Sequence, residues 1–177
     1  MSSSPKEPQY KAIAFTGPSG SGKTTLIETI ARRLTPTRRI AIVKHDPKDK
    51  AHFDRPGKDS DRFYKTGADV AVVSPTRTTL FAHQNHTIAQ IAEMFGEYDL
   101  LMVEGLKTLP LPRLAIFRNT IEPDYLPVVE AIAIDDSIDL NAYDLPEDLD
   151  VLDLNDIGSI IEWIDTHATP FKGTYVS

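Results

Sequence analysis

Residues 17–24 read GPSGSGKT, and this short stretch constrains the fold more than any other part of the chain. It follows an apolar run at 11–16 (KAIAFT), which has the length of a buried strand. It precedes apolar residues at helical spacing between Leu26 and Leu34, and Pro36 limits that pattern. The sequence therefore predicts a strand, a glycine-rich loop and a helix in immediate succession.

The loop matches the pattern G-x-x-x-x-G-K-[ST] in the strand–helix context that this pattern requires. Glycines allow a close approach that a Cβ would block, and successive N–H groups then form a nest for an anion. The N-terminus of the following helix adds positive potential. The Lys23 ammonium can contact the β- and γ-phosphates of a nucleoside triphosphate, and the Thr24 hydroxyl can bind Mg²⁺. The predicted phosphate-binding residues are Gly17, Pro18, Ser19, Gly20, Ser21, Gly22, Lys23, Thr24 and Thr25.

A magnesium site beside such a loop needs an acidic residue at the end of a neighbouring strand. Glu104 closes the apolar run LLMV at 100–103, although Asp is commoner at this position. We predict that Thr24, Glu104 and Asp46 bind the metal. The predicted catalytic residues are Lys23, Glu104, Asp46 and Arg62.

A second strand is expected at 38–45 (RRIAIVKH). Ligands of open α/β sheets lie outside the carboxyl ends of the strands. Lys44, His45 and Asp46 are therefore expected to face the phosphates. The polar residues 46–59 contain two prolines, and a structureless loop of this length is often part of a functional site.

Basic residues lie at the end of that loop and just beyond it, where Lys58 and Arg62 can bind a second anion. A metal site in this segment has no recognised ligand spacing, so we prefer to interpret its histidines and acids as ordinary surface residues. The residues concerned are His45, Asp46, His52 and Asp54.

Strands and helices alternate along most of the chain, and the strands are continuous apolar runs. Such runs are typical of strands buried on both faces of a parallel sheet. Further strands are expected at 68–74, 78–83, 99–105, 113–117, 130–135 and 151–154. Further helices are expected at 59–65, 86–95 and 156–167. The predicted fold class is α/β, with a doubly wound, mostly parallel sheet of the P-loop NTPase type.

The domain organisation follows from these elements. We expect a disordered tail at 1–9 and a single P-loop NTPase domain at 10–170. Two neighbouring strands at about 68–83 have no helix between them, which predicts a small antiparallel β extension.

Charge and composition exclude several functional classes. The net charge of −7 is unevenly spread: residues 32–65 carry +6 and residues 121–177 carry −13. An acidic chain is a poor candidate for sequence-independent binding of nucleic acid, and a basic segment favours a compact anion. No apolar run approaches the roughly 20 residues that cross a bilayer. The absence of cysteine fits a reducing compartment, so we expect a cytoplasmic protein without nucleic-acid or membrane partners.

Four sequence elements in fixed order resemble the molybdopterin-guanine dinucleotide biosynthesis protein B (MobB) family. They are GPSGSGKT (17–24), VKHD (43–46), DRPGKDSDRFYKTGAD (54–69) and DLLMVEGLK (99–107). Many families share the first element, whereas PGKDS-x-R followed by GAD, together with VEG-x-K, is far more specific.

The resemblance implies a GTP-binding accessory protein with weak Mg²⁺-dependent GTPase activity, acting in the formation or delivery of molybdopterin guanine dinucleotide. It also implies a homodimer, and as partners molybdopterin guanylyltransferase, molybdopterin itself and molybdoenzyme apoproteins. The family-specific site positions are Lys44, His45, Asp46, Asp54, Gly57, Lys58, Asp59, Ser60, Arg62, Glu104, Gly105 and Lys107.

The choice of base is not evident, because the common GTPase signature N-K-x-D is absent. The segment at 119–124 (NTIEPD) has Thr120 in place of the lysine. Asn119 or Asp135, each near the end of a late strand, can read guanine through its ring N–H groups.

Two other function classes remain open at this stage. A small-molecule kinase using ATP shares the P-loop, and residues 46–62 with Arg55, Lys58 and Arg62 can form its lid. Asp46 would then receive the acceptor's proton. The other class is a nucleotide-gated interaction module that does not hydrolyse. Because we identify no water-positioning Gln and no arginine finger in cis, turnover should be slow, with Arg62 of a facing subunit as the candidate finger.

Overall fold

The computed structural model describes residues 9–51 and 54–172. The chain forms two compact units, one comprising Met1–His45 with Ile88–Ser177 and the other Asp46–Thr87. Apart from residue 9, the predicted tail lies outside the described residues, as does His52.

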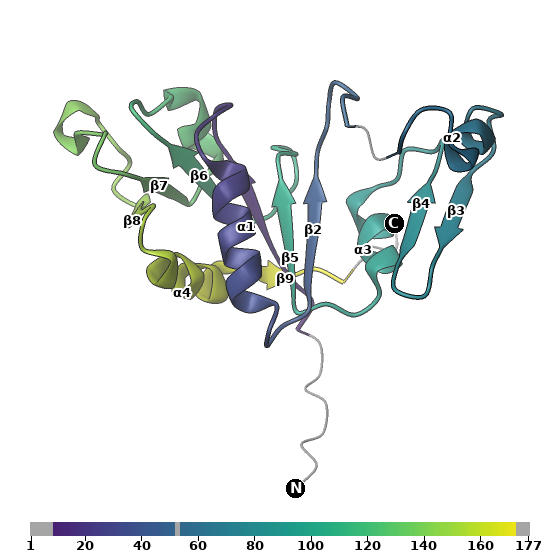
Figure 1. Ribbon diagram of the computed structural model, residues 1–177. Helices are drawn as coiled ribbons and strands as arrows, with labels where there is room; N and C mark the ends of the chain where they lie inside the picture. Colours follow the sequence, from purple (N-terminus) through teal and green to yellow (C-terminus); the bar gives the residue numbers. More distant parts are fainter. Residues whose placement is uncertain (1–8, 52–53, 173–177) are drawn as a thin grey trace, which may run out of the picture. The chain divides into compact units, whose positions relative to one another are not determined.

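A seven-stranded sheet forms the centre of the first unit (Figure 1). Six strands run parallel in the order β2-β5-β1-β6-β7-β8, and β9 pairs antiparallel with the start of β1. The strands are β1 (Lys11–Thr16), β2 (Ile40–Lys44), β5 (Leu100–Glu104), β6 (Arg113–Phe117), β7 (Ala131–Ile134), β8 (Asp150–Asp153) and β9 (Thr169–Pro170).

Helices and 3₁₀ turns cover both faces of this sheet. The helices α1 (Lys23–Leu34) and α4 (Ile157–His167) pack together with one face, through residues such as Ile30 and Ile164. Helix α3 (Ile88–Phe95) packs on the other face around Ala92. The 3₁₀ helices η1 (Pro123–Val128) and η2 (Leu140–Ala142) lie in the segments that cover β6 and β7.

The central strands are buried on both sides, as their unbroken apolar runs predicted. Residues 12–15 of β1 and 114–117 of β6 have no exposed surface. At about 25 cal/mol per Å² of apolar surface, this burial is the main source of the unit's stability. The doubly wound, mostly parallel sheet is confirmed.

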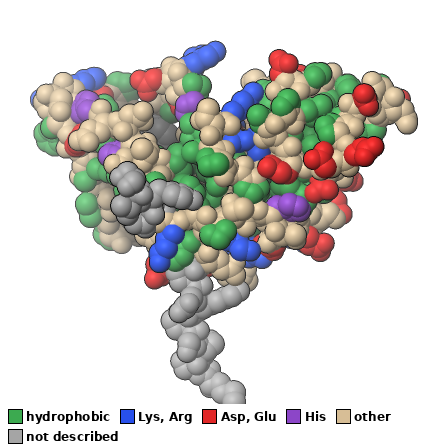
Figure 2. Space-filling view, turned by 180° about the vertical axis from the view of Figure 1, so that it is seen from behind, with side chains coloured by type: hydrophobic (Ala, Val, Ile, Leu, Met, Phe, Trp, Pro, Cys, Tyr) green, Lys and Arg blue, Asp and Glu red, His purple; other side chains and the backbone are tan. Residues whose placement is uncertain are grey.

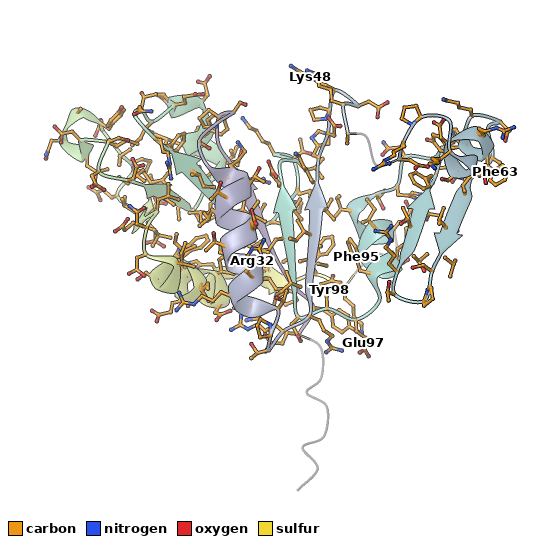
Figure 3. All side chains as sticks on the ribbon, viewed as in Figure 1. Arg32, Lys48, Phe63, Phe95, Glu97 and Tyr98 are labelled. Atoms are coloured by element: carbon orange, nitrogen blue, oxygen red, sulfur yellow. The ribbon has the colours of Figure 1, made fainter. Side chains whose placement is uncertain are left out.

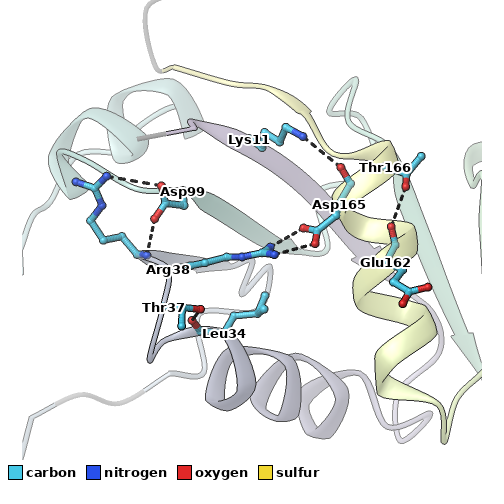
Figure 4. Close-up of polar contacts among 9 residues, drawn as sticks. Lys11, Leu34, Thr37, Arg38, Asp99, Glu162, Asp165 and Thr166 are labelled. Carbon is cyan, nitrogen blue, oxygen red and sulfur yellow. Dashed lines mark hydrogen bonds and ion pairs between the residues drawn. The ribbon is translucent and has the colours of Figure 1, made fainter. Parts of the chain in front are cut away.

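Polar contacts fasten the end of the sheet where β1 begins (Figure 4). Arg38 donates two hydrogen bonds to the carboxylate of Asp165, and Lys11 donates one to the Asp165 carbonyl at 3.2 Å. Asp99 accepts from the backbone N–H of Arg39 at 2.8 Å. These contacts join α4 and the chain after α1 to the sheet at the end farthest from the glycine-rich loop.

The second unit contains α2 (Asp59–Tyr64) and an antiparallel hairpin of β3 (Val70–Val73) and β4 (Thr78–Phe81). The predicted β extension is confirmed as this hairpin. The rings of Tyr64 and His83 stack at 3.9 Å between centroids. No described residue of this unit is fully buried, and Phe63 on α2 is 59% exposed (Figure 3).

The first unit carries its charge asymmetrically. Acidic side chains gather on the side that holds β6, β7 and β8, seen on the right in Figure 2. Within the described parts of the chain, no helix combines the length and the apolar character needed to span a membrane.

Candidate functional site

The carboxyl ends of three neighbouring strands meet beside the glycine-rich loop. Glu104 at the end of β5 is in register with Phe15 of β1 on one side and Lys44 of β2 on the other. The N–H of His45 donates to the Glu104 carbonyl at 3.0 Å. The sheet thus brings together candidates that lie far apart in the sequence.

Three glycines give the loop a backbone shape that other residues rarely adopt. Their φ angles are 129° at Gly17, 78° at Gly20 and 99° at Gly22, all in the left-handed region. A Cβ on Gly17 would lie 2.4 Å from the Ile116 carbonyl oxygen, which is shorter than any tolerated contact. Gly17 is therefore required where the loop leaves β1 against β6.

The N-terminal end of α1 opens onto this loop. Gly22, which has no side chain to cap the helix, occupies the N-cap position. The first turn begins with Lys23, Thr24 and Thr25 and contains no acid, so its positive potential is not offset there. Free N–H groups at a helix N-terminus are well suited to bind a phosphate.

Lys23 folds back over the loop. Its ammonium donates to the carbonyl of Gly17 at 2.9 Å and also to that of Pro18. Burial lowers the pKa of Lys23, while the nearby Glu104 carboxylate raises it and the Lys44 ammonium lowers it further. These interactions show that Lys23, Glu104 and Lys44 share one electrostatic environment, in which a further anion would be stabilising.

Ser21 provides a test of whether the loop fits a ligand. Its side chain is buried, and within the described chain its hydroxyl oxygen lacks a hydrogen-bond partner. A buried polar atom without a partner costs about 1–3 kcal/mol. The loop thus holds an unsatisfied polar group beside a positive helix end, which fits a site built for a polar anion. Thr24 and Glu104 stay our predicted ligands for a Mg²⁺ ion at this loop.

The segment after β5 is held by a buried arginine. Arg113, only 1% exposed, donates to the carbonyls of Gly105 at 2.9 Å and of Leu106 and Leu109 at 3.1 Å. The Lys107 ammonium lies 3.7 Å from the centre of the Tyr125 ring. The ammonium of Lys107 therefore lies against η1, the 3₁₀ helix that contains Tyr125.

Seven of the predicted site residues belong to the second unit. Asp46 accepts from the backbone N–H groups of Lys50 and Ala51, at 2.7 and 2.6 Å. Ser60 donates its hydroxyl to Asp54, next to a cavity of about 450 Å³ that both residues line. The other four are exposed and lie just before or within α2: Gly57, Lys58, Asp59 and Arg62. Their roles toward a nucleotide stay predictions.

The described residues contain no group of three or more His, Cys, Asp or Glu side chains that could hold a metal ion. Mg²⁺ at phosphate sites is commonly bound by one or two protein groups, substrate phosphates and water. Thr24 and Glu104 are compatible with that kind of site.

Arg118 is a site residue that the sequence analysis missed. A Cβ on Gly22 would lie 3.5 Å from the Arg118 Nε and 3.7 Å from its Nη2, so the guanidinium lies against the glycine-rich loop. The Arg118 Nε is also 3.4 Å from the Asp135 carboxylate. Its position directly after the apolar strand β6, beside β1, was the available signal.

A parallel sheet in this strand order, with a strand, glycine-rich loop and helix at its centre, defines a protein of the P-loop NTPase fold. A family model for Molybdopterin guanine dinucleotide synthesis protein B matches residues 12–135. The chain therefore belongs to the MobB family, as its motifs predicted.

Other proteins of known name are similar to this chain over most of its length. The molybdopterin-guanine dinucleotide biosynthesis adapter protein of Haemophilus influenzae is 29% identical over 171 residues, which cover 93% of each chain. A probable adapter protein of the same name from Bacillus subtilis is 32% identical over 134 residues, covering 71% of this chain and 75% of that protein. A structure of Bacillus subtilis MobB has a TM-score of 0.68 at 21% identity and covers 89% of this chain and 97% of its own.

Proposed function

We propose that this protein binds Mg²⁺·GTP in the glycine-rich loop, hydrolyses it slowly, and serves as an adapter in molybdopterin guanine dinucleotide formation or delivery. The observation that carries the proposal is the convergence of Lys23, Lys44 and Glu104 at the carboxyl ends of β1, β2 and β5. The adapter role is supported by the names of the similar proteins.

The residues of the site divide the work of binding. Lys23 and the N–H groups at the start of α1 contact the phosphates. Thr24 and Glu104 hold Mg²⁺, which neutralises charge on the phosphate oxygens when it is bound. Lys44, exposed at the end of β2, adds a second positive charge on the same edge of the sheet.

Slow hydrolysis follows from the residues available near the phosphates. Glu104 can orient water as well as Mg²⁺. An arginine finger contributes roughly 10³–10⁵ in rate, and our candidate is Arg62 of the partner in a homodimer. Asp46 completes the proposed metal and catalytic set. Molybdopterin guanylyltransferase, molybdopterin and molybdoenzyme apoproteins are the proposed partners, and the cytoplasm is the proposed compartment.

Glu104→Gln is expected to change the metal dependence more than nucleotide binding. The amide keeps the shape of the side chain but removes the negative charge that attracts Mg²⁺. We expect hydrolysis to fall by about 10-fold or more, matching the 10–100-fold losses seen when groups supporting a metal are removed. Titrating GTPase activity against Mg²⁺ measures this. Glu93→Gln on the exposed side of α3 is the control, and an unaltered Mg²⁺ profile in Glu104→Gln would place the metal-binding acid at another residue.

Titration calorimetry of the purified protein with Mg²⁺·GTP, and separately with Mg²⁺·ATP, tests the proposed function. We expect measurable affinity for GTP and at least tenfold weaker affinity for ATP. A preference for ATP would contradict the GTP proposal and favour the alternative of an ATP-dependent small-molecule kinase. The next experiment would then be a search for the phosphate acceptor.

A further inference from the structure

Two loops after β6 and β7 meet beside the glycine-rich loop. From β1 the chain passes to β2 on one side of the sheet, whereas β6, β7 and β8 extend on the other side. Ligands of open α/β sheets bind in the crevice at such a reversal of strand order. A nucleotide whose phosphates occupy the glycine-rich loop therefore has the ends of β6 and β7 as neighbours.

The Arg118 guanidinium lies against Gly22, at the point where the loop becomes α1. Nearly half of the side chain, 47%, remains exposed. A guanidinium is planar, always charged and stacks readily on aromatic rings. Arg118 thus presents a flat surface within reach of a nucleoside attached to phosphates in the loop.

Asp135 lies beside the edge of the Arg118 guanidinium. Its Oδ1 accepts the hydroxyl hydrogen of Ser137, and its Oδ2 lies 3.4 Å from the Arg118 Nε. The hydrogen bond from Ser137 lowers the pKa of Asp135, and Arg118 acts in the same direction. The carboxylate is therefore ionised at neutral pH and can only accept hydrogen bonds.

Asn119 joins the two loops. Its backbone, with φ of 63°, directs its N–H to the Ser137 hydroxyl oxygen at 2.7 Å. Its carboxamide is exposed and offers both donors and an acceptor. Residues from both loops are thus fixed around one point by Ser137.

Guanine and adenine differ in what they offer such a cluster. Guanine presents two donors side by side, the ring N1–H and the exocyclic N2 amine, which match the two oxygens of a carboxylate. Adenine presents an acceptor at the ring N1 and a donor at N6, so one carboxylate oxygen would face a lone pair. The N7 of either purine is an acceptor for the Asn119 amide.

We propose that Arg118, Asn119 and Asp135 form a nucleobase subsite in which Asp135 selects guanine and Arg118 stacks on the ring. This inference rests on the proposed binding of GTP and assigns its specificity to named residues. On binding, the base replaces the long contact between Arg118 and Asp135. Arg118 supports any purine, whereas Asp135 distinguishes between them.

The test is calorimetry of wild type, Asp135→Asn and Arg118→Ala with the Mg²⁺ complexes of GTP, ATP and xanthosine triphosphate. Asp135→Asn should weaken GTP binding about 5- to 150-fold, the range for one bidentate contact to a base. It should strengthen xanthosine triphosphate binding, because xanthine offers a donor and an acceptor that match an amide. Arg118→Ala should weaken GTP and ATP equally, by about fivefold or more. Asp136→Asn, the neighbouring exposed acid, is the matched control and should change neither.

The outcomes separate this inference from the proposed function. If wild type prefers GTP but Asp135→Asn retains that preference and gains nothing for xanthosine triphosphate, the subsite is wrong and GTP binding stands. If Arg118→Ala leaves both affinities unaltered, the stacking role is wrong. If wild type binds none of the triphosphates, both proposals fail together.

Discussion

Replacing Lys23 by alanine is expected to weaken triphosphate binding about 30-fold or more. The half-buried ammonium already points into the loop, where it donates to two backbone carbonyls. Burial lowers the pKa of Lys23, because water solvates its ammonium poorly there. A phosphate anion at this point would therefore stabilise the charge of Lys23. Removing one partner of a buried charge pair typically costs about 2–5 kcal/mol. Calorimetry with Mg²⁺·GTP provides the measurement.

Lys11→Ala is the matched control for Lys23→Ala. Lys11 begins β1 at the opposite end from the loop, where it contacts the Asp165 carbonyl (Figure 4). Its removal should leave nucleotide affinity within twofold of wild type. Equal affinities in wild type and Lys23→Ala would show that the phosphates bind outside the glycine-rich loop.

Arg113→Met is expected to lower the free energy of unfolding by about 3–5 kcal/mol, the range for breaking a buried charged contact. Methionine occupies similar space but donates nothing, so the carbonyls of Gly105, Leu106 and Leu109 lose their donor inside the protein. Burial lowers the pKa of Arg113, whereas the Glu130 carboxylate raises it. Urea unfolding of the two proteins measures the difference.

Arg32→Met provides the surface comparison. Arg32 is exposed on α1 and pairs with Glu28 one turn away, and such pairs contribute only about 0.3–0.5 kcal/mol (Figure 3). Hydrogen exchange should also rise at residues 105–112 in Arg113→Met and stay unchanged in Arg32→Met. A loss of stability below about 1 kcal/mol in Arg113→Met would mean that water or another donor replaces the guanidinium.

The sheet and its main helices were predictable because their signals are local. Continuous apolar runs marked β1, β5 and β6, and helical spacing of isoleucines marked α4. Strand ends were less accurate. Arg38 and Arg39, expected within a strand, precede β2. The Arg38 guanidinium pairs with Asp165, and the Arg39 N–H donates to the Asp99 side chain rather than to a strand carbonyl.

Elements that depend on distant partners were not predicted. The two-residue strand β9 contains a proline and has no periodic pattern, and it exists only because β1 lies beside it. The 3₁₀ helices η1 and η2 are short and irregular, so the position of Tyr125 beneath Lys107 could not be foreseen.

The candidate site was predictable to a similar extent. The loop follows from a motif, and Glu104 follows from a motif combined with the order of the strands. Arg113 was missed because its partners are backbone carbonyls, and residue type does not reveal where carbonyls point. Arg118 was missed because its contact with Gly22 requires β6 to neighbour β1, an adjacency formed by residues almost 100 positions apart.

Residues 46–87, which form the second unit, are an insertion between β2 and α3 of the first unit. All strand pairs of the seven-stranded sheet form without residues 46–87. Substitutions or changes of length in this insertion should therefore leave the register of the seven-stranded sheet unchanged. The architecture is modular in this sense: the sheet that carries the glycine-rich loop takes no strand from residues 46–87.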